Sequence, residues 1–196
     1  MIDYGAGNLF SIRWALERLG LDADISSNPG GLRDADAIVL PGVGNFTATS
    51  RNIGRLKPEV GRLVEEGVPL FGVCLGLQLL FHASEEGPGE GLGLLRGEVL
   101  RMPGHVKTPH MGWNTLRLTR HSEILDGVDA GDHFYFVHSY YARPEDVQIV
   151  VAETDYGLRF PSVVAAGNIY GTQFHPEKSG EPGGRILRNF ARAVKR

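Results

Sequence analysis

Residues 69–76 read Pro-Leu-Phe-Gly-Val-Cys-Leu-Gly, a short apolar run that passes directly into a cysteine between two glycines. Residues 69–73 have the length and composition of a buried strand, and residues 75–83 have the spacing of an amphipathic helix. The sequence therefore predicts a sharp strand-to-helix turn at Cys74. Such turns occur where a strand of a sheet connects to a helix that covers one of its faces.

Strands and helices also alternate between this turn and the N-terminus. We expect a strand tail at residues 2–4, a helix at 9–19 with Asn8 as N-cap, a buried strand at 36–40 ended by Pro41-Gly42, and a helix that Pro58 opens and Gly67 ends.

The second half of the chain is richer in strands. We expect them at residues 98–102, 114–118, 134–138, 149–153, 162–166 and 169–174, with a tight hairpin at 166–168 and a last helix from about residue 184. The pattern predicts one α/β domain over residues 1–196, with three layers and a mixed, mostly parallel sheet covered by helices on both faces.

Composition excludes several classes of protein. The chain has 196 residues, a formal net charge of −3 and one cysteine. The charge argues against nucleic-acid binding, and the apolar runs are too short to span a membrane. A single cysteine excludes an internal disulfide and a four-cysteine metal site, which fits a reducing cytoplasm. We expect no metal and no cofactor; Gly5-Ala6-Gly7 lacks the third glycine of a dinucleotide site, because Phe10 stands there.

Cys74 has the setting of a nucleophile. The run Gly72-Val73-Cys74-Leu75-Gly76 is the cysteine form of a nucleophile elbow, in which flanking glycines relieve a strained turn. The following helix would point its positive end at the sulfur, and the Leu75 N–H would face a developing oxyanion. The alternative is that Cys74 is a small buried apolar residue.

His175 is the best candidate for the base. It follows an apolar strand, and Glu177 lies two residues on, on the same side of an extended chain. Glu177 can thus orient one imidazole nitrogen and leave the other for Cys74. His138 is the competitor, but no acidic residue stands two positions away. We interpret His82, His105 and His121 as surface residues.

Residues 41–44, Pro-Gly-Val-Gly, end the strand before the elbow strand. Glycines on both sides of Val43 allow the backbone to approach a ligand and a peptide plane to turn over. This stretch is either a second oxyanion-hole donor or an ordinary strand-to-helix loop.

Taken together, Pro-Gly-x-Gly at 41–44, Gly-x-Cys-x-Gly at 72–76, Gln78 and His175-Pro176-Glu177 resemble the class I, triad-type glutamine amidotransferases. The resemblance covers nearly the whole chain and implies their flavodoxin-like fold. It implies that Cys74 attacks the carboxamide of L-glutamine, that His175 moves the proton and that Glu177 orients His175. Gln78, Ser139 and Tyr140 would bind glutamine, and Val43, Gly44 and Leu75 would form the oxyanion hole.

Further motifs resemble the glutaminase subunits of imidazole glycerol phosphate synthases: residues 3–8, 41–46, 109–114, 136–140 and 175–179. The resemblance implies a heterodimer with a (β/α)8-barrel cyclase subunit, which receives the ammonia and makes imidazole glycerol phosphate and an aminoimidazole carboxamide ribotide in histidine biosynthesis. The partner would set the Val43–Gly44 peptide in place. Residues expected near the partner are Asn8, Met111, Trp113, Tyr135 and Lys178, although Met111 and Trp113 suit a core equally well.

Three alternatives stay open. Other triad glutaminases serve pyridoxal phosphate, anthranilate or purine synthesis; a non-catalytic binding module could keep the fold; and a cysteine peptidase or γ-glutamyl hydrolase would work without a partner. The resemblance also indicates that the first strand is shortened, since family members begin several residues before Asp3.

Overall fold

The computed structural model describes residues 1–5 and 7–195. Along the chain its elements are α1 (Leu9–Glu17), η1 (Pro29–Leu32), β1 (Ile38–Leu40), α2 (Phe46–Glu65), β2 (Leu70–Val73), α3 (Leu75–Gln78), β3 (Ala83–Ser84), β4 (Gly97–Arg101), β5 (His110–Thr115), β6 (Arg117–Leu118), η2 (Glu123–Leu125), β7 (His133–His138), β8 (Tyr140–Pro144), η3 (Val147–Ile149), β9 (Val150–Asp155), β10 (Arg159–Ala166), β11 (Ile169–Thr172), η4 (Pro176–Lys178) and α4 (Gly180–Val194).

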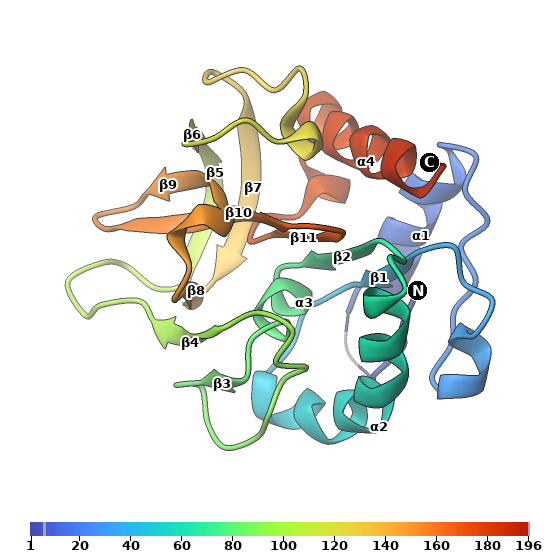
Figure 1. The fold of residues 1–196 in the computed structure, drawn as a ribbon. Helices are drawn as coiled ribbons and strands as arrows, with labels where there is room; N and C mark the ends of the chain where they lie inside the picture. The colour runs from blue at the N-terminus through green and yellow to red at the C-terminus, as the bar shows by residue number, and fades with distance from the viewer. Residues whose placement is uncertain (6, 196) are drawn as a thin grey trace.

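A six-stranded sheet in the order β1-β2-β11-β10-β9-β6 forms the centre of the molecule (Figure 1). Its mixed character is confirmed, but parallel pairing is confined to β1, β2 and β11, so the sheet is less parallel than predicted. The reason is local: β10 and β11 form the predicted hairpin through Gly167 and Asn168, and β9 adds to it antiparallel. Gly167 has φ +58°, which this tight turn requires.

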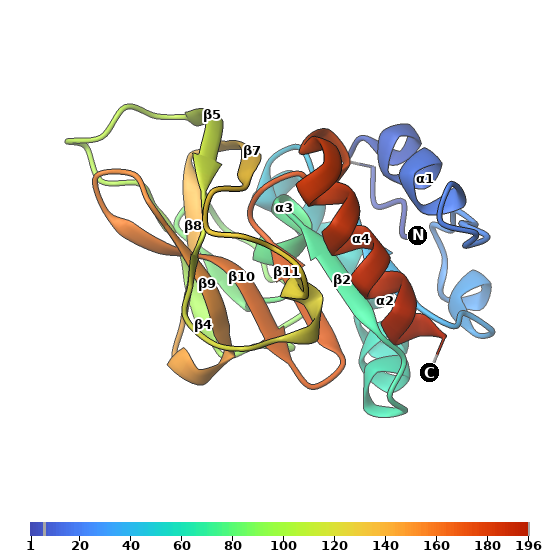
Figure 2. The ribbon, with the colours of Figure 1, turned by 90° about the horizontal axis from the view of Figure 1, so that it is seen from above.

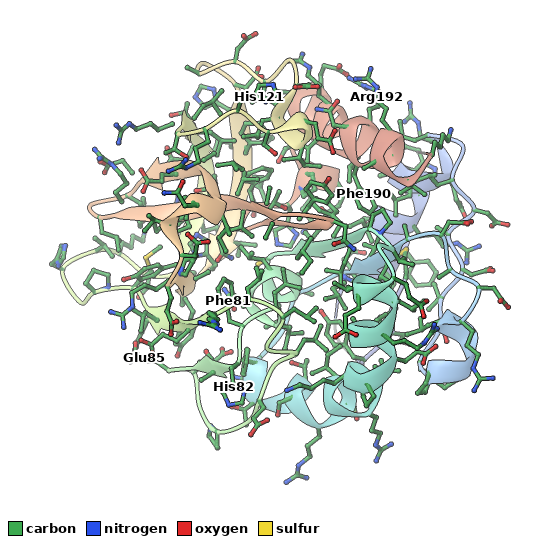
Figure 3. The ribbon with its side chains drawn as sticks, viewed as in Figure 1. Phe81, His82, Glu85, His121, Phe190 and Arg192 are labelled. Carbon is green, nitrogen blue, oxygen red and sulfur yellow. The ribbon has the colours of Figure 1, made fainter. Side chains whose placement is uncertain are left out.

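Helices cover both faces of the parallel part of the sheet, which gives the predicted three layers (Figures 1 and 2). Val39 and Phe71 face α1 and α4, whereas Ile38 and Leu70, one residue before each, face α2. This alternation follows from the two-residue period of a strand. On α4, Phe190 points to the sheet and Arg192 points outward (Figure 3).

The other strands form two small sheets, β3-β4-β8 and β5-β7, beside the helical layers. In Figure 1 they lie with β9 on the side of the molecule opposite α1 and the N-terminus. The single strand predicted for residues 114–118 is wrong, because β5 ends at Thr115 and pairs with β7, whereas β6 joins the main sheet. Of the strand tail predicted at residues 2–4, the structure shows one bridge, between Ile2 and Ser26.

The helix predicted to open at Pro58 begins at Phe46 instead, and Pro58 lies inside it. A proline inside a helix costs about 3 kcal/mol, because it lacks an N–H and its ring meets the carbonyl one turn earlier. The apolar stripe of α2 continues through this position, and its burial against the sheet outweighs that cost; the buried members are Phe46, Ile53, Leu56, Val60 and Leu63.

The amphipathic helix predicted for residues 75–83 is also wrong, since α3 ends at Gln78 and all of residues 70–81 are buried. The carbonyl of Leu79 accepts the N–H of Leu92 at 2.7 Å, so it is not available to continue a helix. At the C-terminus, α4 begins at Gly180 and not near residue 184, because Pro182 fits the first turn of a helix.

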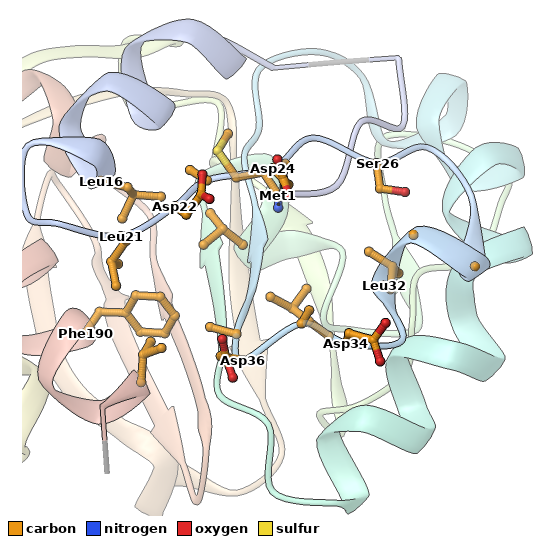
Figure 4. Close-up of a pocket in the computed structure, with 18 residues that line it drawn as sticks. Met1, Leu16, Leu21, Asp22, Asp24, Ser26, Leu32, Asp34, Asp36 and Phe190 are labelled. Carbon is orange, nitrogen blue, oxygen red and sulfur yellow. Dashed lines mark hydrogen bonds between the residues drawn. The ribbon is translucent and has the colours of Figure 1, made fainter.

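A cavity of about 460 Å³ opens between α4 and the segment that follows α1, and Asp22, Asp24, Asp34 and Asp36 line it (Figure 4). None of the predicted site residues lines it. Within residues 1–5 and 7–195, no helix is both long and apolar enough to cross a membrane.

Candidate active site

Three neighbouring strand ends bring the predicted catalytic segments together. Cys74 directly follows β2, Pro41 follows β1, and His175 stands shortly after β11. β2 is hydrogen-bonded to both β1 and β11, with Val73 opposite Thr172. The Cys74 N–H donates to the Thr172 carbonyl at 2.7 Å. The site thus lies at the carboxyl edge of the parallel strands, where ligands of open α/β sheets bind.

Cys74 has the strained backbone that the elbow predicts. Its φ is +53°, and it is the only described residue other than glycine with a positive φ. Glycines allow the turn to pack: a Cβ on Gly76 would lie 1.9 Å from the Leu40 carbonyl oxygen, and one on Gly42 would lie 2.4 Å from the Gly76 nitrogen. Because α3 has one turn only, the dipole at its N-terminal end stabilises a Cys74 thiolate much less than the predicted longer helix would.

The Cys74 sulfur is largely buried, with the residue 6% exposed. The thiol donates to the Val137 carbonyl at 3.8 Å, and the Gln173 Nε2 donates to the sulfur at 3.6 Å. Val137 belongs to β7 and Gln173 follows β11, so two separate elements hold the nucleophile.

His175 and Glu177 form a buried pair. Nδ1 of His175 lies 2.9 Å from Oε1 of Glu177, and the two side chains are 2% and 3% exposed. Nε2 of His175 has no hydrogen-bond partner, which leaves it available to a reacting proton. Burial alone would lower the pKa of His175, but interactions with Cys74 and Glu177 outweigh it and raise the pKa to about 9. The imidazole therefore holds a proton well at neutral pH.

His138, the competing base, is committed elsewhere. Its Nδ1 lies 2.8 Å from the Tyr140 carbonyl oxygen and its Nε2 lies 3.1 Å from Nδ1 of His110. Burial is the main cause that lowers the pKa of His138 to about 3. A group that stays neutral down to this pH is a poor proton acceptor at pH 7, so the geometry favours His175 as the base.

A cavity of about 310 Å³ opens beside the sulfur. Seven of its lining residues were predicted site residues: Val43, Gly44, Cys74, Leu75, Gln78, Ser139 and Tyr140. The other four are Glu86, Pro109, Val137 and His138. Gln78 Nε2 donates to the Tyr140 carbonyl at 3.0 Å, which joins two of the predicted glutamine-binding residues directly. No three His, Cys, Asp or Glu side chains of the described residues are grouped so as to hold a metal ion.

Comparison with known proteins identifies the family. The profile of "Glutamine amidotransferase class-I" matches residues 1–194. Two proteins named "Imidazole glycerol phosphate synthase subunit HisH" are close relatives. The one from Halobacterium salinarum is 54% identical, with 97% of this chain and 90% of the relative covered. The one from Moorella thermoacetica is 47% identical, with 100% and 94% covered.

The chain belongs to the HisH family of class I glutamine amidotransferases.

The fold of this HisH-family chain agrees with that assignment. A solved structure titled "Crystal structure of glutamine amidotransferase" matches with a TM-score of 0.78 over 100% of this chain and 98% of its own, at 24% identity. At that identity the match concerns the fold only. It supports the mixed sheet and the placing of helices on both faces described above.

In this HisH-family chain, the Leu75 N–H predicted for the oxyanion hole is already occupied. It donates to the Gly42 carbonyl at 3.4 Å, and Gly42 precedes the exposed Val43. The peptide that blocks the donor is therefore Gly42–Val43, one position before the Val43–Gly44 peptide named from the sequence. Gly44 has φ +138°, a conformation that favours glycine.

Three of the residues expected at the partner face of this HisH-family chain contact one another. Trp113 and Tyr135 pair across β5 and β7, with ring centroids 5.8 Å apart, and the Lys178 Nζ lies 5.8 Å from the Tyr135 ring centroid. Met111 and Trp113 are 62% and 57% exposed, which excludes the core interpretation. Asn8 accepts a hydrogen bond from the Ser11 N–H, so the predicted N-cap is confirmed.

Four side chains near the site of this HisH-family chain were not singled out from the sequence. Glu86 lines the cavity and accepts the Phe46 N–H at 2.5 Å. Gln173 contacts the sulfur. Phe10 and Trp14 on α1 are 82% and 60% exposed and line a cavity of about 580 Å³ that reaches Glu177. For Gln173 the sequence offers one hint, because Gln173 precedes His175 by two residues and so shares its side of the chain.

Proposed function

We propose that this chain hydrolyses L-glutamine at Cys74, as the glutaminase subunit of imidazole glycerol phosphate synthase in histidine biosynthesis, and passes the ammonia to the cyclase subunit. The observation that carries the proposal is the buried His175–Glu177 pair with a free Nε2, on the strand end beside a cysteine that lines a 310 Å³ cavity. The names of the HisH relatives supply the synthase and the subunit.

The chemistry follows from this arrangement. The Cys74 thiol gives its proton to His175, and the thiolate attacks the carboxamide carbon of glutamine. When the C–N bond breaks, His175 returns the proton to the leaving nitrogen, which departs as ammonia and leaves a thioester. Water, deprotonated by His175, attacks the thioester; glutamate leaves and the thiol is restored. Glu177 holds the imidazole in position through both steps.

The cavity suits an amino-acid substrate. The amide N–H groups of Gln78 go to the Tyr140 carbonyl and to Gln173, so Gln78 can offer its Oε1 to the α-ammonium group, which the Glu86 carboxylate also suits. The Gly42 carbonyl opposes the reaction, because it occupies the Leu75 N–H that should bind the oxyanion. We expect the Gly42–Val43 peptide to turn over, which frees Leu75 and directs the Val43 N–H at the oxyanion.

A partner is expected on physical grounds also. Ammonia released into water at neutral pH becomes ammonium, which is a poor nucleophile, and it diffuses away. The exposed apolar side chains Val43, Met111 and Trp113 belong to segments that line the site or pair with a strand that does. A subunit bound over them would cover the cavity and could set the Gly42–Val43 peptide.

The test is to measure glutamine hydrolysis by the chain alone and with the barrel cyclase plus its nucleotide substrate. We expect low turnover alone and a large rise with both present. The Cys74→Ala variant should lose glutamine-dependent synthesis and keep synthesis from ammonium salts. Strong turnover without the partner would contradict the proposal and favour a γ-glutamyl hydrolase.

A further inference from the structure

Gln173 is a buried amide beside the reacting sulfur, and the hydrolysis outlined above does not use it. The residue is 0% exposed. Its Nε2 donates to Cys74 Sγ at 3.6 Å, and its Oε1 accepts from Gln78 Nε2 at 3.3 Å. A polar side chain with no access to water is retained only when its hydrogen bonds are made, and both ends of this amide are engaged inside the site.

The direction of the Gln173 amide follows from its neighbours. Oxygen and nitrogen of an amide are assigned from the hydrogen-bond network. A backbone carbonyl can only accept, and the Tyr140 carbonyl lies 3.0 Å from the Gln78 amide, so the Gln78 NH₂ must point there. The same NH₂ meets the Gln173 amide, which must present its oxygen. The Gln173 NH₂ is then the end that faces the sulfur.

Position in the chain explains why Gln173 meets the sulfur. Gln173 and His175 are two residues apart after β11, so both point to the side of the chain where Cys74 lies, while Phe174 between them packs against Phe134. The Gln173 N–H donates to the Ser162 carbonyl at 2.9 Å, which ties its backbone to β10. The amide is therefore held by a strand and not by a mobile loop.

A neutral N–H donor at this place favours the thiolate over the thiol. Hydrogen bonds to an ionised group are about twice as strong as those between neutral groups, and burial strengthens them further. The one-turn helix α3 stabilises the thiolate only weakly, and the Val137 carbonyl, as an acceptor, favours the protonated thiol.

We propose that Gln173 is a further catalytic residue of the glutaminase: its Nε2–H stabilises and aims the Cys74 thiolate, while its Oε1 positions Gln78 for glutamine. The inference rests on the proposed function for its biological meaning. The experiment measures the reactivity of the Cys74 sulfur, which does not depend on the pathway. The role of Gln173 and the proposed function can therefore be contradicted independently.

The experiment measures the rate of Cys74 alkylation by iodoacetamide from pH 5 to pH 10, using the full chain. Cys74 is the single cysteine, so the reaction reports one site. Gln173→Met removes both hydrogen bonds at nearly constant length. Gln173→Glu keeps an acceptor for Gln78 and replaces the donor to sulfur. Ser162→Ala is the control, since it removes a buried hydroxyl of β10 that bonds Thr154 and not the sulfur.

We expect half-maximal alkylation to move up by about one pH unit in Gln173→Met, which is about a tenfold lower rate below the midpoint, and further in Gln173→Glu. Ser162→Ala should keep the parent profile. With the cyclase present, Gln173→Glu should lower kcat about tenfold or more with a smaller change in KM, because its bond to Gln78 remains.

An unchanged alkylation profile in either Gln173 variant that remains folded would overturn the inference, as would an equal shift in Ser162→Ala. If Gln173→Met does not fold, Gln173→Glu decides. If the alkylation profile shifts but the cyclase does not stimulate glutamine hydrolysis, the role of Gln173 in stabilising the thiolate is supported and the proposed function is contradicted.

Discussion

At the scale of single residues, His175 shows how its surroundings set its proton affinity. Burial opposes the charged imidazole, yet interactions with Cys74 and Glu177 raise its pKa to about 9, whereas burial lowers the pKa of His138 to about 3. The difference lies in the partners, because His138 meets a carbonyl and another histidine but no carboxylate. The interactions with Cys74 and Glu177 thus distinguish the base His175 from the neutral His138.

The Glu177→Gln variant tests this directly. It keeps the shape but removes the charge that orients and supports His175, so kcat for partner-stimulated glutamine hydrolysis should fall by about 10²–10⁴-fold with little change in KM. Steady-state kinetics checks this result. A loss of less than about tenfold would contradict the role proposed for Glu177.

The same pair predicts how stability depends on pH. Because the folded-state pKa of His175 lies above 6.5, its contribution is fully present below pH 6.5 and is lost as pH rises through about 9. Urea unfolding should show a loss of up to about 3 kcal/mol over this window. Glu177→Gln should show a smaller loss, because only the interaction with Cys74 then raises the pKa of His175; an equal slope in both proteins would count against the pairing.

Residues close in sequence were predictable and residues brought together by packing were not. His175 and Glu177 are two apart, so their pairing could be inferred from strand geometry. Glu86 reaches the site only because the turn after β3 lies over the start of α2. The sequence hints that Gln173 shares the side of the chain that His175 occupies, but its contact with Cys74 depends on β11 lying beside β2. Periodicity within one segment carries no information about such contacts.

At the scale of elements, the elbow depends on backbone packing between β1 and α3. Gly76→Ala would place a Cβ 1.9 Å from the backbone oxygen of Leu40, and backbone cannot rotate away as a side chain can. We expect this variant to lose about 3 kcal/mol of unfolding free energy and most activity. Chemical denaturation followed by circular dichroism measures the first.

Gly54→Ala is the matched control, because Gly54 lies in α2 and a Cβ there meets nothing within 4 Å. It should stabilise the chain by about 0.5–1 kcal/mol, since alanine is the better helix former. If both alanines had the same effect, the close approach at Gly76 would not be the cause.

The predicted boundaries of helices were wrong where tertiary contacts overrule local sequence preference. Proline at position 58 is a sound helix-start signal, yet the apolar stripe of α2 extends on both sides of it and its burial decides. The leucines at 75, 77, 79 and 80 are spaced as in one helix, but all of residues 75–80 are buried, so the stretch has no solvent-exposed face and the chain can turn after Gln78. The strands before the elbow were predictable because short apolar runs with glycine or proline ends are local features.

At the scale of the whole molecule, the strand ribbon β5-β7 connects the exposed face with the reacting groups. On its outer side the ribbon exposes Met111 and Trp113. On its inner side two backbone carbonyls of β7 accept hydrogen bonds from the site: Val137 from the Cys74 thiol, and Tyr135 from the backbone N–H of His175 at 2.9 Å. A partner that pressed on this ribbon would therefore touch the supports of both nucleophile and base.

Trp113→Ala tests the proposed partner face. We expect the Kd for the cyclase to rise about thirtyfold or more, because exposed tryptophans are frequent hot spots, while the unfolding free energy changes by less than about 0.5 kcal/mol. Val147→Ala, at a residue 65% exposed on η3, is the control and should leave the Kd within about twofold. Calorimetric titration distinguishes them; equal Kd values for both variants would place the partner elsewhere.

The contact between the Gly42 carbonyl and the Leu75 N–H also has a consequence for the cell. Glutamine serves many biosynthetic routes, and a subunit that hydrolysed it without a recipient would waste the shared supply and release ammonium. With its own carbonyl in the oxyanion position, a copy made in excess of the cyclase would leave glutamine intact. Expression of the two subunits would then need no tight matching, since idle copies would be harmless.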